Sequence, residues 1–391
     1  MPTSPLNELT RLGQSIWYDN ISRELLDSGE LKRMVDEEGV TGVTSNPTIF
    51  DKAIAGSSAY DADIRKLIEV GASAHDIYEG LVVEDVRSAA DVLRAVFDST
   101  QGADGYVSLE VSPLLAADTA ETIEQARHLF SLVGRPNLMI KVPATPEGIP
   151  AIETLTGEGI NVNVTLIFSL GGYRQVADAY VRGLEKRRAD GQPLNRVASV
   201  ASFFVSRVDT AVDSRLDQRI AAETDSAGKQ ALQRLLGTAA ISNSKLAYNM
   251  FEDVFGGRFE SLHEAGANVQ RVLWASTSTK NPAYRDVMYV EELIGPNTVN
   301  TMPPATLAAF RDHGVVRPTL QAGVEQARAN LKALREAGID LDEVTDELLE
   351  AGVTSFAKSF EELMGCITQK RTRLLSEKQQ GRDDGLGTCE R

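Results

Sequence analysis

A lysine in an unusually apolar setting is the first candidate for chemistry in this sequence. Lys141 lies between the apolar residues 138–140 and 142–143, although lysine is almost never fully buried in proteins. Desolvation favours the neutral amine, and a neutral amine can attack a carbonyl carbon to form a Schiff base. In the structural alternative, the lysine extends to solvent or pairs with one carboxylate.

Polar side chains also end most of the other apolar runs. Asp19 ends the first run and Glu110 the third, and both could carry protons. Asn163 and Thr165 alternate with apolar residues in 160–167, so they share one face of a strand. Taken singly, each of these residues could instead cap a helix, form a turn or fill a small space. The other candidates at run ends, or just beyond them, are Asn46, Ser202, Arg207, Ser276 and Lys280.

Eight short apolar runs are expected to form the strands that position these residues. Helical patterns separate the runs, which favours parallel βαβ units and a single (β/α)8 barrel, a TIM barrel of the α/β class. A doubly wound open sheet is the alternative, but no run is followed by the Gly-x-Gly-x-x-Gly turn. In a barrel, the carboxyl ends of all strands surround one mouth, so Lys141, Asp19 and Glu110 should meet there. The expected strands are 15–19, 40–45, 105–110, 137–142, 160–167, 197–204, 271–276 and 297–301.

The rest of the chain is expected to be mostly helical. The two long connections, 47–104 and 205–270, carry several amphipathic stretches and therefore predict extra helices. Residues 317–370 again look helical and should pack on the barrel. We therefore expect one catalytic barrel domain over 1–370. The polar stretch 371–391 has no periodicity and is expected to be a disordered tail.

The composition narrows the possible partners. The chain has 391 residues and a formal net charge of −16, which argues against a nucleic-acid partner. A phosphorylated small molecule is still allowed, because it needs only a few local donors. No signal peptide or membrane-spanning run is visible, so a protein of the reducing cytoplasm is expected. A monomer and a homodimer are both compatible with the sequence.

The sequence predicts neither a metal site nor a cofactor. Its four histidines, at 75, 128, 263 and 313, all fall outside the expected strands. Its two cysteines, at 366 and 389, lie close to the C-terminus. Neither set favours a metal centre, a Ser-His-Asp arrangement or a disulfide framework.

Together, the motifs around these residues resemble those of transaldolases, which are Schiff-base barrel enzymes related to class I aldolases. The similarity extends over roughly residues 7–370, and the motifs follow the family's order. The matching segments are GVTSNPTIF at 42–50, SLEVSP at 108–113, MIKVPATPEGIPAIE at 139–153, NVNVTLIFS at 161–169 and ASFFVSR at 201–207.

The resemblance implies specific roles for the candidate residues. Lys141 corresponds to the Schiff-base lysine, and Glu110 to the acid/base that acts through a water molecule, which Thr165 helps to hold. Asp19 corresponds to the base that takes the proton from the substrate's C4 hydroxyl. The implied substrate-binding residues are Asn46, Asn163 and Ser202 for the sugar hydroxyls and Arg207 for the phosphate.

One segment departs from the family pattern. Many transaldolases carry a second phosphate-binding arginine after the seventh strand, whereas Ser278 stands at that place here. Lys280 and the hydroxyls of Ser276 and Ser278 could supply the missing donors, with the lysine acting as a point charge.

The resemblance implies transfer of a dihydroxyacetone unit from sedoheptulose 7-phosphate to glyceraldehyde 3-phosphate. The products would be erythrose 4-phosphate and fructose 6-phosphate, in the pentose phosphate pathway. Two alternatives are a fructose 6-phosphate aldolase and a non-catalytic barrel that binds sugar phosphates. Glu110 favours the transferase over the aldolase, whose pattern has glutamine there, and the retained Lys141 argues against a non-catalytic protein.

Overall fold

Eight parallel strands form a closed barrel in the order of the chain, as the sequence predicts. The computed structural model describes residues 4–386. Each observed strand overlaps its predicted range, with ends that differ by at most two residues. The strands are β1 (Gln14–Tyr18), β2 (Val40–Val43), β3 (Tyr106–Glu110), β4 (Leu138–Pro143), β5 (Val162–Ile167), β6 (Ser199–Phe204), β7 (Gln270–Ala275) and β8 (Thr298–Met302).

The strands are buried on both faces, which explains their nearly continuous apolar runs. All residues of β3, β4, β5 and β6 are buried. Their outward-facing side chains pack under the surrounding helices and belong to one large hydrophobic cluster. The polar residues among them therefore require a partner or a function.

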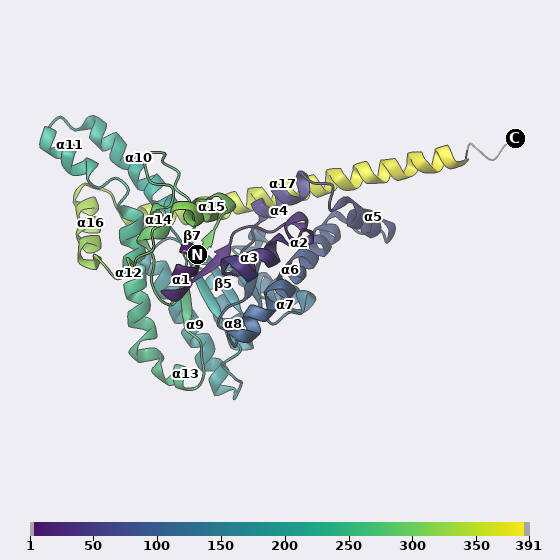
Figure 1. Ribbon diagram of the computed structural model, residues 1–391, viewed down its shortest axis with the longest axis horizontal. Coiled ribbons are helices and arrows are strands. Elements are labelled where there is room, and N and C mark those ends of the chain that lie inside the picture. Colours follow the sequence, from purple (N-terminus) through teal and green to yellow (C-terminus); the bar gives the residue numbers. More distant parts are fainter. Residues whose placement is uncertain (1–3, 387–391) are drawn as a thin grey trace.

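Helices follow the strands and cover the barrel (Figure 1). Local signals explain several helix ends: Asn46 and Asp118 cap α4 and α7 with their side chains, and Ser73 and Asp76 form a capping box on α6. The helices before β6 are α1 (Pro5–Arg11), α2 (Arg23–Asp27), α3 (Glu30–Glu38), α4 (Pro47–Ala55), α5 (Asp61–Glu69), α6 (Ala74–Ser99), η1 (Pro113–Leu115), α7 (Thr119–Val133), α8 (Gly148–Glu158) and α9 (Leu170–Ala189).

Both long connections contain several helices, as expected from their amphipathic stretches. The first holds α4, α5 and α6, and the second holds five helices from α10 to α13. In Figure 1, α10, α11, α12 and α16 form a group at the left of the barrel. The helices after β6 are α10 (Ser206–Ala222), α11 (Ser226–Gln233), α12 (Ala239–Phe255), η2 (Gly257–Phe259), α13 (Glu260–Glu264), α14 (Met288–Glu292), α15 (Pro304–His313), α16 (Val324–Glu336) and α17 (Leu341–Leu386).

The C-terminal helix is longer than the sequence analysis expected. Residues 371–386 continue α17, whereas we expected a disordered tail from residue 371. Leu374 is buried and Arg373 pairs with Asp61, so tertiary contacts hold the helix around these two residues despite its weak periodicity. Residues 387–391 lie outside the described residues. The end of α17 extends well beyond the barrel (Figure 1).

Candidate active site

Lys141 and Glu110 are direct neighbours across two strands. Their Cα atoms are paired in the register of β3 and β4, so their side chains emerge side by side. Lys141 Nζ lies 3.4 Å from Glu110 Oε2 and donates to the backbone carbonyl of Ser45 at 3.2 Å. Lys141 is 6% exposed and Glu110 is 7% exposed. The buried lysine thus has one carboxylate within reach.

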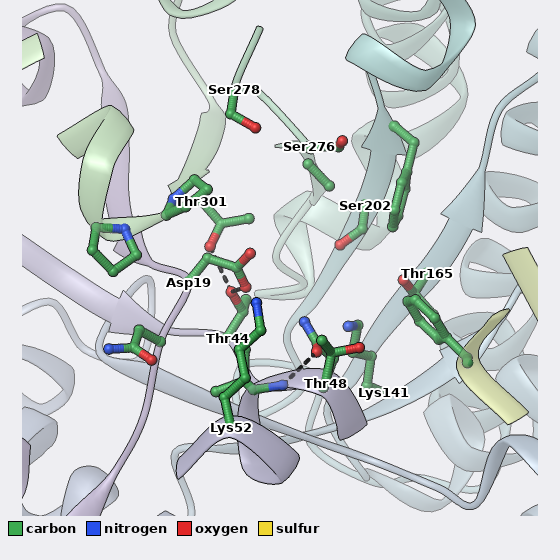
Figure 2. A pocket seen from close by; sticks show the side chains of 18 of the residues that line it. Asp19, Thr44, Thr48, Lys52, Lys141, Thr165, Ser202, Ser276, Ser278 and Thr301 are labelled. Atoms are coloured by element: carbon green, nitrogen blue, oxygen red, sulfur yellow. Dashed lines mark hydrogen bonds between the residues drawn. The ribbon is translucent and has the colours of Figure 1, made fainter. Parts of the chain in front are cut away.

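Asp19 follows β1, and its carboxylate lies at the end of a hydrogen-bonded chain of two threonine hydroxyls. Thr44 Oγ1 donates to Asp19 Oδ1 at 2.6 Å, and the same Thr44 oxygen lies 2.6 Å from Thr301 Oγ1. Because the single hydroxyl proton of Thr44 goes to the carboxylate, Thr301 must be the donor in the second bond. Both contacts are drawn in Figure 2. This chain fixes the orientation of the Asp19 carboxylate.

The polar residues of β5 and β6 also meet. Ser202 Oγ donates to Asn163 Oδ1 at 2.7 Å, and Asn163 Nδ2 donates to Ser108 Oγ at 2.9 Å. Thr165 is fully buried, and its hydroxyl has no hydrogen-bond partner among the described residues. The next residue, Leu166, has a φ of 60°, and the pairing of β5 with β6 is irregular there. Such an irregularity can redirect a side chain toward a site.

A group of donors lies on the side of the mouth formed by β7 and α10. Arg207 is in the first turn of α10 and is partly buried, with its guanidinium 5.2 Å from the centre of the Phe204 ring. Ser276 Oγ lies 2.9 Å from Ser206 Oγ, and Lys280 Nζ donates to Ser278 Oγ at 2.7 Å. Figure 2 shows Ser276 and Ser278 above Ser202 at the same opening.

One cavity of about 600 Å³ collects most of the predicted residues. Its lining includes Asp19, Asn46, Lys141, Thr165, Ser202, Arg207, Ser276, Ser278 and Lys280. Two predicted residues do not line it. Glu110 lines two small separate cavities, and Asn163 is hydrogen-bonded to Ser202. Each nevertheless contacts a residue of the main cavity: Glu110 contacts Lys141, and Asn163 contacts Ser202.

Burial shifts the ionisation of the site in a consistent way. It raises the pKa of Asp19, which the Thr44 hydrogen bond and the charge of Lys141 partly lower again. Burial also raises the pKa of Glu110, against the opposing effect of Lys141. Desolvation lowers the pKa of the Arg207 guanidinium. Carboxyl groups with raised pKa values are suited to exchange protons near neutral pH.

The cavity also contains residues that the sequence analysis missed. Four of them are Thr44, Thr301, Lys52 and Phe356. Thr301 ends the eighth expected strand, and Thr44 lies near the end of the second, so the search for polar residues at strand ends could have found both. Lys52 is on α4 and Phe356 on α17, where nothing in the local sequence indicates a position at the barrel mouth.

The described residues contain no group of histidine, cysteine, aspartate and glutamate that could hold a metal ion. Within the same residues, no helix is both long and apolar enough to span a membrane. The cavity presents an amine, the Asp19 carboxylate, several hydroxyls and cationic side chains, and the Glu110 carboxylate contacts the amine from outside its lining.

Comparison with known proteins identifies one family. Residues 16–367 match the family model described as Transaldolase/Fructose-6-phosphate aldolase. A transaldolase of Trichodesmium erythraeum is 47% identical over 377 residues, which cover 96% of this chain and 99% of the relative. Transaldolases of Thiobacillus denitrificans and Acidothermus cellulolyticus are each 50% identical, over 92% and 96% of this chain and 98% and 99% of their own lengths.

Proposed function

Because this chain belongs to the transaldolase/fructose-6-phosphate aldolase family, we propose that it is a transaldolase acting through a Schiff base at Lys141. The observation that carries the proposal is the buried Lys141 amine 3.4 Å from Glu110, beside the cavity that holds Asp19. The substrates are phosphorylated sugars, with sedoheptulose 7-phosphate as donor and glyceraldehyde 3-phosphate as acceptor. The reaction belongs to the pentose phosphate pathway in the cytoplasm and needs no cofactor.

The first half of the reaction forms and cleaves the enzyme-bound donor. The Lys141 amine attacks the C2 carbonyl, and Glu110 moves protons, through a water molecule that Thr165 helps to hold, as the carbinolamine loses water. Asp19 then takes the proton of the C4 hydroxyl. The C3–C4 bond breaks, the aldehyde leaves, and the electron pair moves into the iminium, which becomes an enamine. A carboxylate held by Thr44 is well placed to accept that proton.

The second half reverses these steps with a new aldehyde. The enamine carbon attacks the aldehyde of glyceraldehyde 3-phosphate, and Asp19 returns its proton to the new C4 hydroxyl. Water then attacks C2 of the iminium, and fructose 6-phosphate leaves. Asn46 and Ser202 bind sugar hydroxyls, and Asn163 orients Ser202 through its hydrogen bond.

The phosphate is bound on the side of the cavity formed by α10 and the segment after β7. Arg207 provides one cation, and its guanidinium is not committed to a carboxylate among the described residues. Lys280 and Ser276 supply further donors in place of the second arginine of many relatives. Because the Lys280 side chain is exposed, it can move toward the phosphate at little cost in desolvation.

Reductive trapping tests this proposal directly. With fructose 6-phosphate and borohydride, wild-type protein should gain a three-carbon adduct that peptide mapping places on Lys141. Lys141→Ala should give no adduct and lose activity by on the order of 10⁴-fold, because the nucleophile is gone. Lys245→Ala is the matched control, since Lys245 is a buried lysine on α12 that does not line the cavity.

Two outcomes would contradict the proposal. Binding of fructose 6-phosphate without any adduct would indicate a non-catalytic sugar-phosphate protein. Rapid release of dihydroxyacetone from fructose 6-phosphate, unaffected by added erythrose 4-phosphate, would indicate an aldolase instead of a transferase.

A further inference from the structure

The C-terminal helix places an aromatic ring against the candidate Schiff-base lysine. Lys141 Nζ lies 5.4 Å from the centre of the Phe356 ring, within the range of a cation–π contact. Phe356 is 7% exposed and lines the same cavity as Asp19 and Thr165. It is more than 200 positions away from Lys141 along the chain, so the contact depends entirely on where α17 packs.

Three contacts fix α17 at this place. Thr48 Oγ1 of α4 donates to Ser359 Oγ at 2.9 Å. Gly352 packs so closely on β5 that a Cβ atom there would lie 2.9 Å from Leu166 Cδ2. One turn after Phe356, the Phe360 ring packs edge-on against Tyr78 at 5.3 Å. These contacts hold the helix backbone on both sides of Phe356, and so they fix the position of its ring.

The site around Lys141 is otherwise largely polar. The hydroxyl groups of Thr44 and Ser202 and the amide group of Asn46 line the same cavity as the lysine. A polar cavity admits water, and water is harmful once the donor has been cleaved. The enamine can then take a proton at C3, water can add to C2, and the C2–N bond can break. These steps release free dihydroxyacetone and the lysine amine before any acceptor has bound.

We propose that Phe356 is a specificity-determining residue that favours transfer over release by keeping water away from the intermediate at Lys141. The inference rests on the proposed function, since it concerns the fate of the transaldolase intermediate. The ring occupies the space next to the lysine nitrogen with a surface that offers water no strong hydrogen bond. Its face also stabilises the positive charge of the iminium before cleavage.

The test measures how fructose 6-phosphate is divided between two products. Free dihydroxyacetone is measured without acceptor, and sedoheptulose 7-phosphate is measured with erythrose 4-phosphate present. Phe356→Ala should raise the ratio of release to transfer by roughly tenfold, because it opens space for water at the intermediate. Phe356→Met retains apolar volume and should keep the ratio within about threefold of wild type.

Leu363→Ala is the control, because Leu363 is also buried on the same helix but lines neither the cavity at Lys141 nor the two small cavities at Glu110. It should leave the ratio unchanged. An equal rise in this variant would assign the effect to helix packing and overturn the proposal, as would an unchanged ratio in Phe356→Ala. If Phe356→Ala does not fold, an unchanged ratio in Phe356→Thr, which admits water with a smaller loss of volume, would overturn it. Failure of the wild type to form the Lys141 adduct would instead refute the proposed function.

Discussion

At the scale of single residues, the basicity of Asp19 depends on two threonines. Burial raises the pKa of Asp19, and the hydrogen bond from Thr44 is the largest effect that lowers it. Thr301 donates to Thr44 in turn, which makes the Thr44 proton a better donor to the carboxylate. A general base must be ionised to act, so this chain widens the pH range in which Asp19 can accept a proton.

Replacing Thr44 with valine should therefore change the pH profile. Without its hydroxyl donor, the pKa of Asp19 rises further, and the acid limb of kcat moves to higher pH. We expect kcat to fall by up to about tenfold on the acid side, since a hydrogen bond to a charged group is worth about 1.5 kcal/mol. The loss should be much smaller at alkaline pH, where Asp19 is ionised in both proteins. Steady-state rates measured across pH check this.

Thr41→Val is the control for this prediction. Thr41 lies on β2, three positions before Thr44, and its hydroxyl donates to the Ile16 carbonyl at 3.3 Å without reaching the cavity. Its pH profile should match that of the wild type. A Thr44→Val profile reduced equally at every pH would show that Thr44 has no influence on the ionisation of Asp19.

At the scale of secondary structure elements, α10 carries Arg207 and also contacts the segment that carries Lys280, so it links the two cationic residues proposed to bind the phosphate. Arg207 is in its first turn, and Asp213 lies further along the same helix. Asp213 accepts hydrogen bonds from Tyr284 Oη at 2.6 Å and from the Gly237 backbone at 3.0 Å. Tyr284 belongs to the segment between β7 and α14 that carries Lys280. The position of that segment therefore depends on α10.

Tyr284→Phe should loosen the Lys280 segment while keeping the ring. We expect the KM for sedoheptulose 7-phosphate to rise about fivefold, as the loss of one hydrogen bond of about 1 kcal/mol implies, with kcat nearly unchanged. Turnover of unphosphorylated fructose as donor should not change, because it has no phosphate to bind. Tyr248→Phe, which removes a hydroxyl bonded to the Pro296 carbonyl away from the cavity, is the control. Equal losses for both donors would argue against a phosphate-specific effect.

The elements also show what could be predicted from the sequence. The strands and most candidate residues follow from local patterns, because a barrel strand is a short apolar run and its carboxyl end faces the mouth. Lys52 and Phe356 could not be found in this way, since helices far from β4 in sequence bring them to the cavity. The helical residues around Arg373 and Leu374 were missed for the same reason, because their contacts are tertiary.

At the scale of the whole molecule, α17 connects the two sides of the barrel mouth. Near its start, Glu347 pairs with Arg215 of α10, and further along, Lys370 pairs with Asp61 at the start of α5. Between these ends, Thr48 of α4 is bonded to Ser359. Contacts at both ends and in the middle of α17 therefore hold the helix that places Phe356 beside Lys141.

The thermal stability of two truncated proteins should show which part of α17 is held by contacts with the rest of the protein. Ending the chain after Lys378 keeps the described side-chain contacts of this helix, including the Lys378–Glu69 pair, so this protein is the reference. Ending it after Gln369 removes the buried Leu374 and the Lys370 pair, so stability should fall by about 2–3 kcal/mol. Thermal unfolding would then begin several degrees lower. Equal melting temperatures for the two truncated proteins would mean that α17 is held by its first half alone, and that its distal contacts do not fix Phe356.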